Sequence, residues 1–454
     1  MPNNTHHEKN SSLSLRPYFL ALMLMIFQYW ECWWLFQING NNLTALFISI
    51  TFITLLVFFV LDLKFSPKKI KIQDAFVWAV ISLWIISSSR SLICGYKMKA
   101  VSIPLGIVLI MLIACAYIIS YKKNLIYPLM ASMIFFIIFY SAKYIENNQF
   151  EVFFEPGMPF WLVNENSQRL LQGQWIYRYE DYSMLPYPLL LIFPYLPFKF
   201  FNMDLRWANV LATCITVFLA FYAGKYSRFK NYRLLILIFF LSPATIYSML
   251  STHIFFYCLL LAFFIITINK GKIAWQKTLL LFSCFIRPLS LSLVPAWLIY
   301  QLKPKRSSPF LGLKKFYLIM KPSLLDITLI LITLSPVIVS AKCFFWNLLN
   351  HPYLDGLKSI KLSNFPQSST QLSLSYLLPY WKNLYLVSLT QLLGLLGICY
   401  LFYKKNYLYR NPDKSLIFCY MLFISLGVQL YNYYWFPVMA MSLFSALTEE
   451  ERKK

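Results

Sequence analysis

The feature that most constrains this chain is the recurrence of long apolar runs separated by short polar connections. Of its residues 59% are hydrophobic and only 13% are charged, whereas a water-soluble domain carries about 25% charged residues. Only helices and closed barrels satisfy their backbone polar groups in lipid, and runs of this length are typical of transmembrane helices. The sequence therefore predicts an all-α polytopic membrane protein with about 12–14 transmembrane helices, including one broken pair. The expected runs are 17–37, 44–61, 75–93, 101–120, 125–142, 206–224, 234–249, 254–268, 278–301, 323–341, 384–403, 415–430 and 435–447.

Lysine and arginine give the chain a formal net charge of +24, and they cluster in short connections between these runs. Such connections face the cytoplasm in membrane proteins, so the charge does not indicate a nucleic-acid partner. The basic connections are 64–71, 121–124, 225–233, 270–277, 303–321 and 404–414. Counting runs from them places loops 143–205 and 342–383 outside and both chain ends inside. Connection 90–99 is also basic but counts as outside, so either run 75–93 or run 101–120 does not cross, or the rule is overridden there.

These assignments divide the chain into successive regions. Two external loops separate three groups of transmembrane helices, and the first loop is acidic. The regions are 1–142 (five apolar runs), 143–205 (first external loop), 206–341 (central helices), 342–383 (second external loop) and 384–454 (C-terminal helices and tail).

Run 278–301 is interrupted at its centre by Arg287 and Pro288. The connections on both sides of it are basic, so a single crossing would break the alternation of sides. Proline ends or kinks a helix, and irregular backbone within a membrane is tolerated where it lines a cavity. We therefore expect two short half-helices that rise to Arg287 and return.

The first external loop is acidic in a basic chain. Between residues 146 and 204 it holds seven acidic and three basic residues, a balance of −4. The acidic residues are Glu146, Glu151, Glu155, Glu165, Glu180, Asp181 and Asp204. An acidic, aromatic loop between apolar helices is typical of the working face of a membrane enzyme that handles sugars, and we expect it to contain short amphipathic helices lying on the membrane.

Residues 170–211 carry a spaced motif: Leu170, Leu171, Gly173, Tyr177, Tyr187, Pro188, Leu189, Arg206, Asn209 and Leu211. This segment resembles the GT-C superfamily of integral membrane glycosyltransferases, which use polyprenyl- or dolichyl-phosphate sugars. Arg287 with Pro288 and Pro295, and the late aromatic-proline helix with Tyr434, Trp435 and Pro437, agree with the same family. The resemblance implies a GT-C-like fold and transfer of a hexose, most simply mannose, to a glycolipid or surface glycan. Five apolar runs precede the loop here, where relatives commonly have one.

The family implies a carboxylate base on the first external loop, which takes a proton from the acceptor hydroxyl. Pro159 stands where many relatives have aspartate. The nearest acids are Glu155, then Glu151 and, downstream, Glu165, and we rank them in that order. The alternative is that each glutamate only solvates an exposed loop.

A phosphate-bearing donor requires cations near the outer surface, and the planar guanidinium of arginine suits phosphate oxygens. Arg287 is the main candidate because a cation inside an apolar run is costly and usually functional. Arg206, Lys143 and His253 are further candidates. The alternatives are a buried ion pair or a snorkelling side chain for Arg287, interface anchors for Arg206 and Lys143, and a plain turn residue for His253.

Sugar recognition calls for aromatic faces and polar edges. We expect Tyr177 and Tyr187 of the motif, and Arg178 next to Tyr177, to bind substrate, and the aromatic second external loop adds His351. Nucleotide-binding glycine motifs and metal-ligand clusters are not found in the sequence, so a lipid-linked donor without a required metal is expected.

The expected partners are membrane lipid, a polyprenyl-phosphate sugar and a glycan or glycolipid acceptor. A bacterial cytoplasmic membrane is favoured over the endoplasmic reticulum. Two other functions stay open: a transporter or flippase of lipid-linked sugars, and a catalytically degenerate scaffold of a glycosylation complex.

Overall fold

The computed structural model describes residues 126–147, 159–177, 188–225, 232–240, 245–246, 249–250, 252–270, 273–302, 317, 319, 321–345, 384–427 and 435–448. Within these ranges every regular element is a helix, which confirms the all-α prediction for this part of the chain. The elements are α5 (Ile126–Asn147), α7 (Pro159–Leu171), η2 (Leu189–Leu191), α8 (Leu196–Phe200), α9 (Arg206–Gly224), α10 (Tyr232–Phe240), α12 (Phe255–Lys270), α13 (Ile273–Ile286), η3 (Pro288–Leu293), α14 (Val294–Gln301), α16 (Leu324–Phe345), α18 (Leu384–Lys404), α19 (Tyr407–Arg410), α20 (Pro412–Ser425) and α21 (Trp435–Thr448).

Four of the described helices are long and apolar enough to cross a membrane. A helix of 20 residues is about 30 Å long, which matches the hydrocarbon core of a bilayer. The four are Ile126–Asn147, Arg206–Gly224, Leu324–Phe345 and Tyr385–Lys404. The predicted total of crossings also depends on runs 17–37, 44–61, 75–93 and 101–120, which lie outside the described residues.

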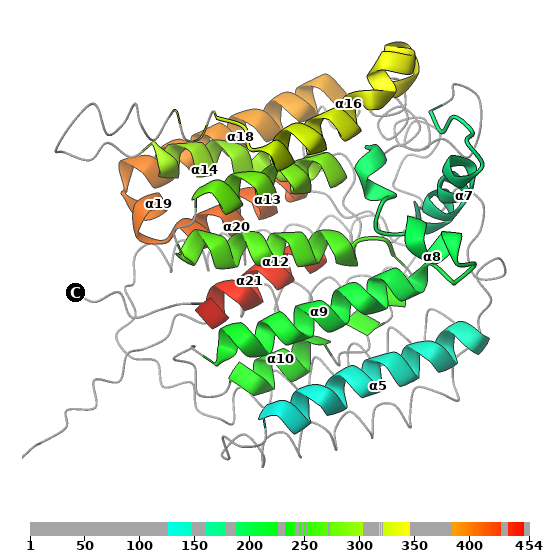
Figure 1. Ribbon diagram of the computed structural model, residues 1–454. Helices are drawn as coiled ribbons and strands as arrows, with labels where there is room; N and C mark the ends of the chain where they lie inside the picture. Colours follow the sequence, from blue (N-terminus) through cyan, green and yellow to red (C-terminus); the bar gives the residue numbers. More distant parts are fainter. Residues whose placement is uncertain are drawn as a thin grey trace, which may run out of the picture.

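Helix α12 runs through the middle of the bundle, between α9 on one side and α13 on the other (Figure 1). It is apolar on all sides, and 11 of its 16 residues are buried. A helix without a polar face is stable only inside such a bundle. By contrast, α5, α16 and α18 lie at the edges of the described set of helices and expose large apolar side chains such as Phe135, Ile338 and Tyr385, as expected where lipid is the solvent.

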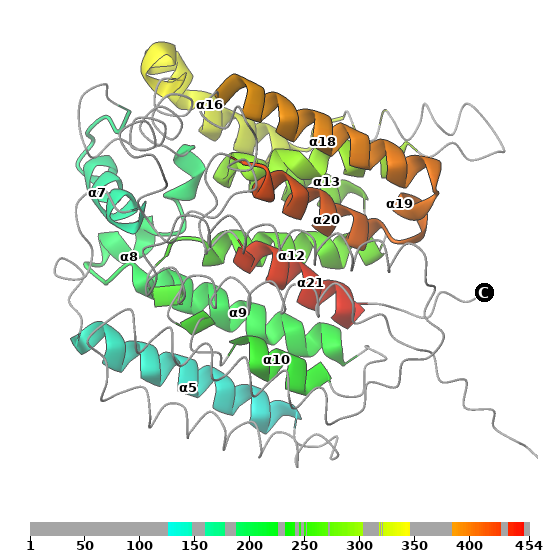
Figure 2. The same ribbon diagram turned by 180° about the vertical axis from the view of Figure 1, so that it is seen from behind.

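The bundle of described helices has two ends that differ in composition. At one end, Asn269 Nδ2 on α12 donates to Thr448 Oγ1 on α21 at 2.5 Å, and Tyr409 on α19 bonds to the backbone oxygen of Ile299 on α14. This end carries many lysines and arginines, including Lys270, Lys277, Lys321, Lys404 and Arg410, and is the one predicted to be cytoplasmic. The opposite end contains α7, α8 and the start of α9, as Figure 2 shows from behind.

The predicted break in run 278–301 is present. α13 ends at Ile286, Arg287 is extended (φ −141°, ψ 117°), and η3 begins at Pro288. A residue before proline is disfavoured in the helical region, and proline cannot donate a hydrogen bond, so the sequence itself enforces the interruption.

The two arms of this broken pair run side by side in opposite directions. Near the start of α13, Gln276 Oε1 accepts hydrogen bonds from Trp297 Nε1 at 3.1 Å and Gln301 Nε2 at 2.6 Å, both on α14. The 14 residues of α13 span only about 21 Å at 1.5 Å per residue. The first arm starts at Ile273, five residues earlier than expected, and its depth in a membrane stays a prediction.

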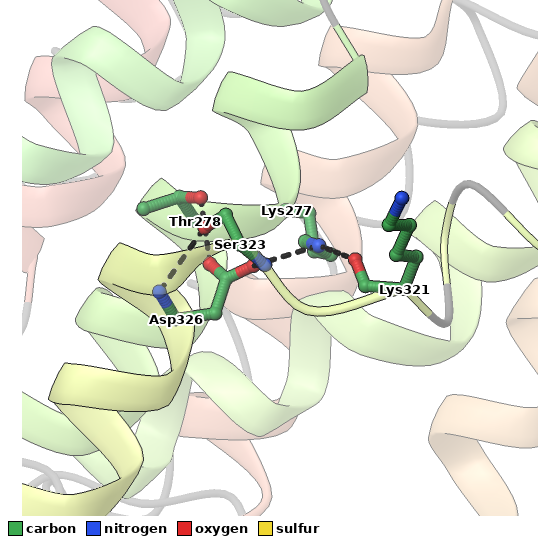
Figure 3. A network of polar contacts seen from close by, with 5 residues as sticks. All are labelled: Lys277, Thr278, Lys321, Ser323 and Asp326. Carbon is green, nitrogen blue, oxygen red and sulfur yellow. Dashed lines mark hydrogen bonds and ion pairs between the residues drawn. The ribbon is translucent and has the colours of Figure 1, made fainter.

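A polar network connects the start of α13, the first helix of the broken pair, to α16 (Figure 3). Lys277 Nζ lies 2.7 Å from Asp326 Oδ2, and Thr278 Oγ1 donates to Asp326 Oδ1 at 2.7 Å. Ser323 and Asp326 form a capping box: each backbone N–H donates to the side chain of the other. Lys277 also donates to the backbone oxygen of Lys321 at 2.6 Å, so the last residues of connections 270–277 and 303–321 lie at the same end, as predicted.

Short helices occupy the described parts of region 143–205, as predicted, and their position on the outer membrane surface stays a prediction. α7 buries Phe160, Leu162 and Val163, and α8 lies beside it (Figure 1). α5 continues to Asn147, five residues past the expected end of its run.

Candidate functional site

The centre of the candidate site is a contact between Arg287 and His253. Arg287 Nη2 lies 2.6 Å from His253 Nε2, and the two side chains are 2% and 0% exposed. Arg287 stands at the break between α13 and η3, and His253 stands in the turn before α12. Both were predicted to bind the donor phosphate, and the structure brings them together.

The chemistry of the two groups fixes the form of the imidazole. A guanidinium carries only hydrogen-bond donors, so His253 Nε2 must be the acceptor and the ring proton must reside on Nδ1. Burial, followed by the adjacent Arg287 charge, lowers the pKa of His253 well below its ordinary value. The ring is therefore neutral near pH 7, and the two side chains together carry one positive charge.

The turn that carries His253 is fixed by buried side chains from α9 and from the first external loop. Asn209 Nδ2 on α9 donates to the backbone oxygens of Met249 at 2.8 Å and Thr252 at 2.5 Å. The hydroxyl of Tyr195, between η2 and α8, lies 2.9 Å from both Asn209 Oδ1 and the backbone oxygen of His253. These bonds connect the external loop directly to the turn.

Further buried hydroxyls lie in the neighbourhood of Arg287. The hydroxyl oxygen of Tyr257 on α12 lies 2.5 Å from Ser290 Oγ on η3 and 3.5 Å from the hydroxyl oxygen of Tyr420 on α20. Arg287 is close enough to interact electrostatically with Tyr195, Tyr257 and Tyr420. A cation framed by hydroxyl groups in a largely apolar core is suited to an oxyanion.

The other predicted cations lie in local ion pairs. Buried Arg206 pairs with Asp204, its Nη2 atom lying 2.6 Å from Oδ2. Exposed Lys143 lies 2.8 Å from Glu146 on the same helix.

Glu165, the third candidate base, lies 3.1 Å from Arg169 one turn further along α7. Tyr177 is fully buried and packs edge-on against Phe344 and Trp175, where its ring supports the first external loop against the end of α16. The remaining predicted site residues lie outside the described residues: Glu151, Glu155, Arg178, Tyr187 and His351.

Four side chains near Arg287 were not singled out as site residues: Tyr195, Tyr257, Ser290 and Tyr420. Tyr257, Ser290 and Tyr420 lie in predicted apolar runs, where a buried hydroxyl requires a partner, and Tyr195 lies in region 143–205. That signal is weak in this chain because 32 tyrosines share it. Asn209 was named as a position of the GT-C-like motif, and no role was predicted for it.

No protein-family model matches this chain, and neither the curated proteins nor the solved structures that were searched include a match.

Proposed function

We propose that the chain is an integral membrane glycosyltransferase that takes a hexose, most simply mannose, from a polyprenyl-phosphate carrier. The acceptor is a glycolipid or surface glycan on the non-cytoplasmic side. The observation that carries the proposal is the buried Arg287–His253 pair at the break of a helix, at the end of the bundle where α7 and α8 lie. The GT-C-like motif in residues 170–211 gives independent support.

The guanidinium binds the phosphate of the donor in this proposal. An arginine buried in an apolar bundle has a high desolvation cost, so its presence favours a functional role. Because His253 is neutral, it orients the guanidinium without cancelling its charge. The positive charge then stabilises the phosphate that leaves during transfer.

In the reaction, the acceptor hydroxyl oxygen attacks the anomeric carbon and forms the new glycosidic bond. The bond from that carbon to the phosphate oxygen breaks, and polyprenyl phosphate leaves with the bonding electrons. A carboxylate base takes the hydroxyl proton. Glu155 is our first candidate and Glu151 the second.

The experiment mixes purified protein in detergent with radiolabelled polyprenyl-phosphate mannose and candidate acceptors. We expect transfer by the native chain, loss of transfer in Glu155→Gln, and retained transfer in Glu180→Gln, a matched change in the same loop. Full activity in both Glu155→Gln and Glu151→Gln would exclude these two bases. No transfer with any lipid-linked sugar would contradict the enzyme.

One observation favours a second function, transport of lipid-linked sugars. α16 contains Pro336 and a non-helical residue, Ser340, so it is a second interrupted helix besides the broken pair. Interrupted helices in corresponding positions are typical of transporters. Scrambling of labelled lipid-linked sugar by the protein in liposomes, without transfer to any acceptor, would support this function over the first.

A further inference from the structure

The hydrogen bonds of Asn209 suggest a role beyond packing. Its buried carboxamide bonds to two backbone oxygens of the turn before α12 and to the hydroxyl of Tyr195, which also contacts the backbone of His253. A carboxamide offers two donors and an acceptor in one plane, a combination that neither leucine nor aspartate reproduces. The side chain of Asn209 therefore holds the turn directly, through Met249 and Thr252, and indirectly, through Tyr195 and the backbone of His253.

The turn is continuous with the candidate site. Thr252 and His253 are adjacent in the chain, and the ring of His253 contacts Arg287 at 2.6 Å. Movement of this backbone would move the imidazole, and the hydrogen bond that orients the guanidinium would be lost. The first external loop takes part through Tyr195.

We propose that Asn209 is a positioning residue for the donor-phosphate site, acting through the His253 turn on the orientation of Arg287. The proposal rests on the proposed function for the identity of the ligand. Its structural part, the coupling of Asn209 to the ring of His253, can be measured without any substrate.

The substrate-free test reads the tautomer of His253 by ¹⁵N NMR of histidine-labelled protein. The chain has four histidines, so His6→Gln, His7→Gln and His351→Gln leave a single labelled ring. In this background we expect one tautomer, with Nδ1 protonated and Nε2 unprotonated. Asn209→Leu should replace it with a mixture of tautomers.

Thr216→Val is the matched control. Thr216 is a buried polar residue on the same helix, and its hydroxyl donates within α9 to the backbone oxygen of Ala212 at 2.6 Å. The control should keep the single tautomer. If Asn209→Leu does not fold, Asn209→Asp decides, because it removes both hydrogen bonds donated to the turn and keeps an oxygen that can accept from Tyr195. An unchanged tautomer in the folded Asn209 variant overturns the proposal.

The second test measures binding of radiolabelled polyprenyl-phosphate mannose. We expect Asn209→Leu to weaken binding about tenfold in the native background and less than about twofold when Arg287 is already alanine, since residues acting through one group are not additive. Equal losses in both backgrounds overturn the positioning role. Unchanged binding in Arg287→Ala alone contradicts the donor site itself, whereas the tautomer measurement tests the coupling separately.

Discussion

The Nη2 atom of Arg287 lies 2.6 Å from Nε2 of His253, although the two residues are 34 positions apart in the chain. A buried arginine is more often expected beside a carboxylate. Here a neutral ring orients it, and the two groups keep a positive charge that a phosphate can use. Because burial beside Arg287 lowers the pKa of His253, the free energy of unfolding should depend on pH.

We expect the stability of the folded chain to decrease as the pH falls below about 6.5, the ordinary pKa of histidine. The unfolded chain binds a proton on His253 in this range, and the folded chain does not, because its pKa is lowered. One such group changes the free energy of unfolding by about 1.4 kcal/mol per pH unit until the folded pKa is reached.

Thermal unfolding in detergent between pH 8 and pH 5 measures this effect. His253→Gln is the comparison, because its side-chain oxygen can accept from Arg287 but does not titrate. The variant should have a shallower decline at low pH. Identical declines in the two proteins would show that His253 is not buried as a neutral ring.

Removal of one partner of the Lys277–Asp326 ion pair should strongly destabilise the folded chain. Asp326 is 2% exposed, and its carboxylate also accepts from Thr278 and Ser323. Removing one partner of a buried pair costs about 3–5 kcal/mol, so Asp326→Ala should markedly lower the unfolding temperature.

An exposed ion pair provides the control for this prediction. Glu146→Gln breaks the contact with Lys143, which is open to water, and should leave the unfolding temperature unchanged. If Asp326→Ala and Glu146→Gln changed the unfolding temperature equally, the contact between the start of α13 and α16 would not stabilise the fold.

The two ends of the bundle should face opposite sides of the membrane. In a chain whose native cysteines are replaced, Glu146→Cys should react with an impermeant thiol reagent added outside intact cells. Lys405→Cys should react only after the membrane is opened. Both positions are exposed, so failure to label would not be due to burial. Labelling of Glu146→Cys only after opening would place the acidic loop inside and contradict the use of an external donor.

The sequence was sufficient for features that depend on local chemistry. The run predicted at 206–224 has the same bounds as α9, and the break at Arg287 follows from the proline after it. The run predicted to begin at residue 323 agrees with the start of α16 at Leu324, and the capping box of Ser323 and Asp326 that fixes this start is also a local feature. These features need only apolar length, proline geometry and capping.

Contacts between distant segments could not be predicted in the same way. In a membrane, lipid is as apolar as a neighbouring helix, so an apolar face does not specify its partner. Nothing in the sequence therefore indicated that Tyr257 lies beside Ser290 and Tyr420, or that Asp326 pairs with Lys277. The ion pairs Arg206–Asp204, Lys143–Glu146 and Glu165–Arg169 are local, and closer attention to spacing could have found them.

The most direct measurement of the central claim is the affinity of purified protein for radiolabelled polyprenyl-phosphate mannose, compared between the native chain and Arg287→Ala. Lys405→Ala, which removes a charge at the opposite end, is the control. Loss of a buried charged partner costs about 2–5 kcal/mol, and each 1.4 kcal/mol is tenfold. We therefore expect Arg287→Ala to weaken donor binding by about 30-fold or more, with the control unchanged. Donor affinity that is the same in native protein and in folded Arg287→Ala would contradict the claim.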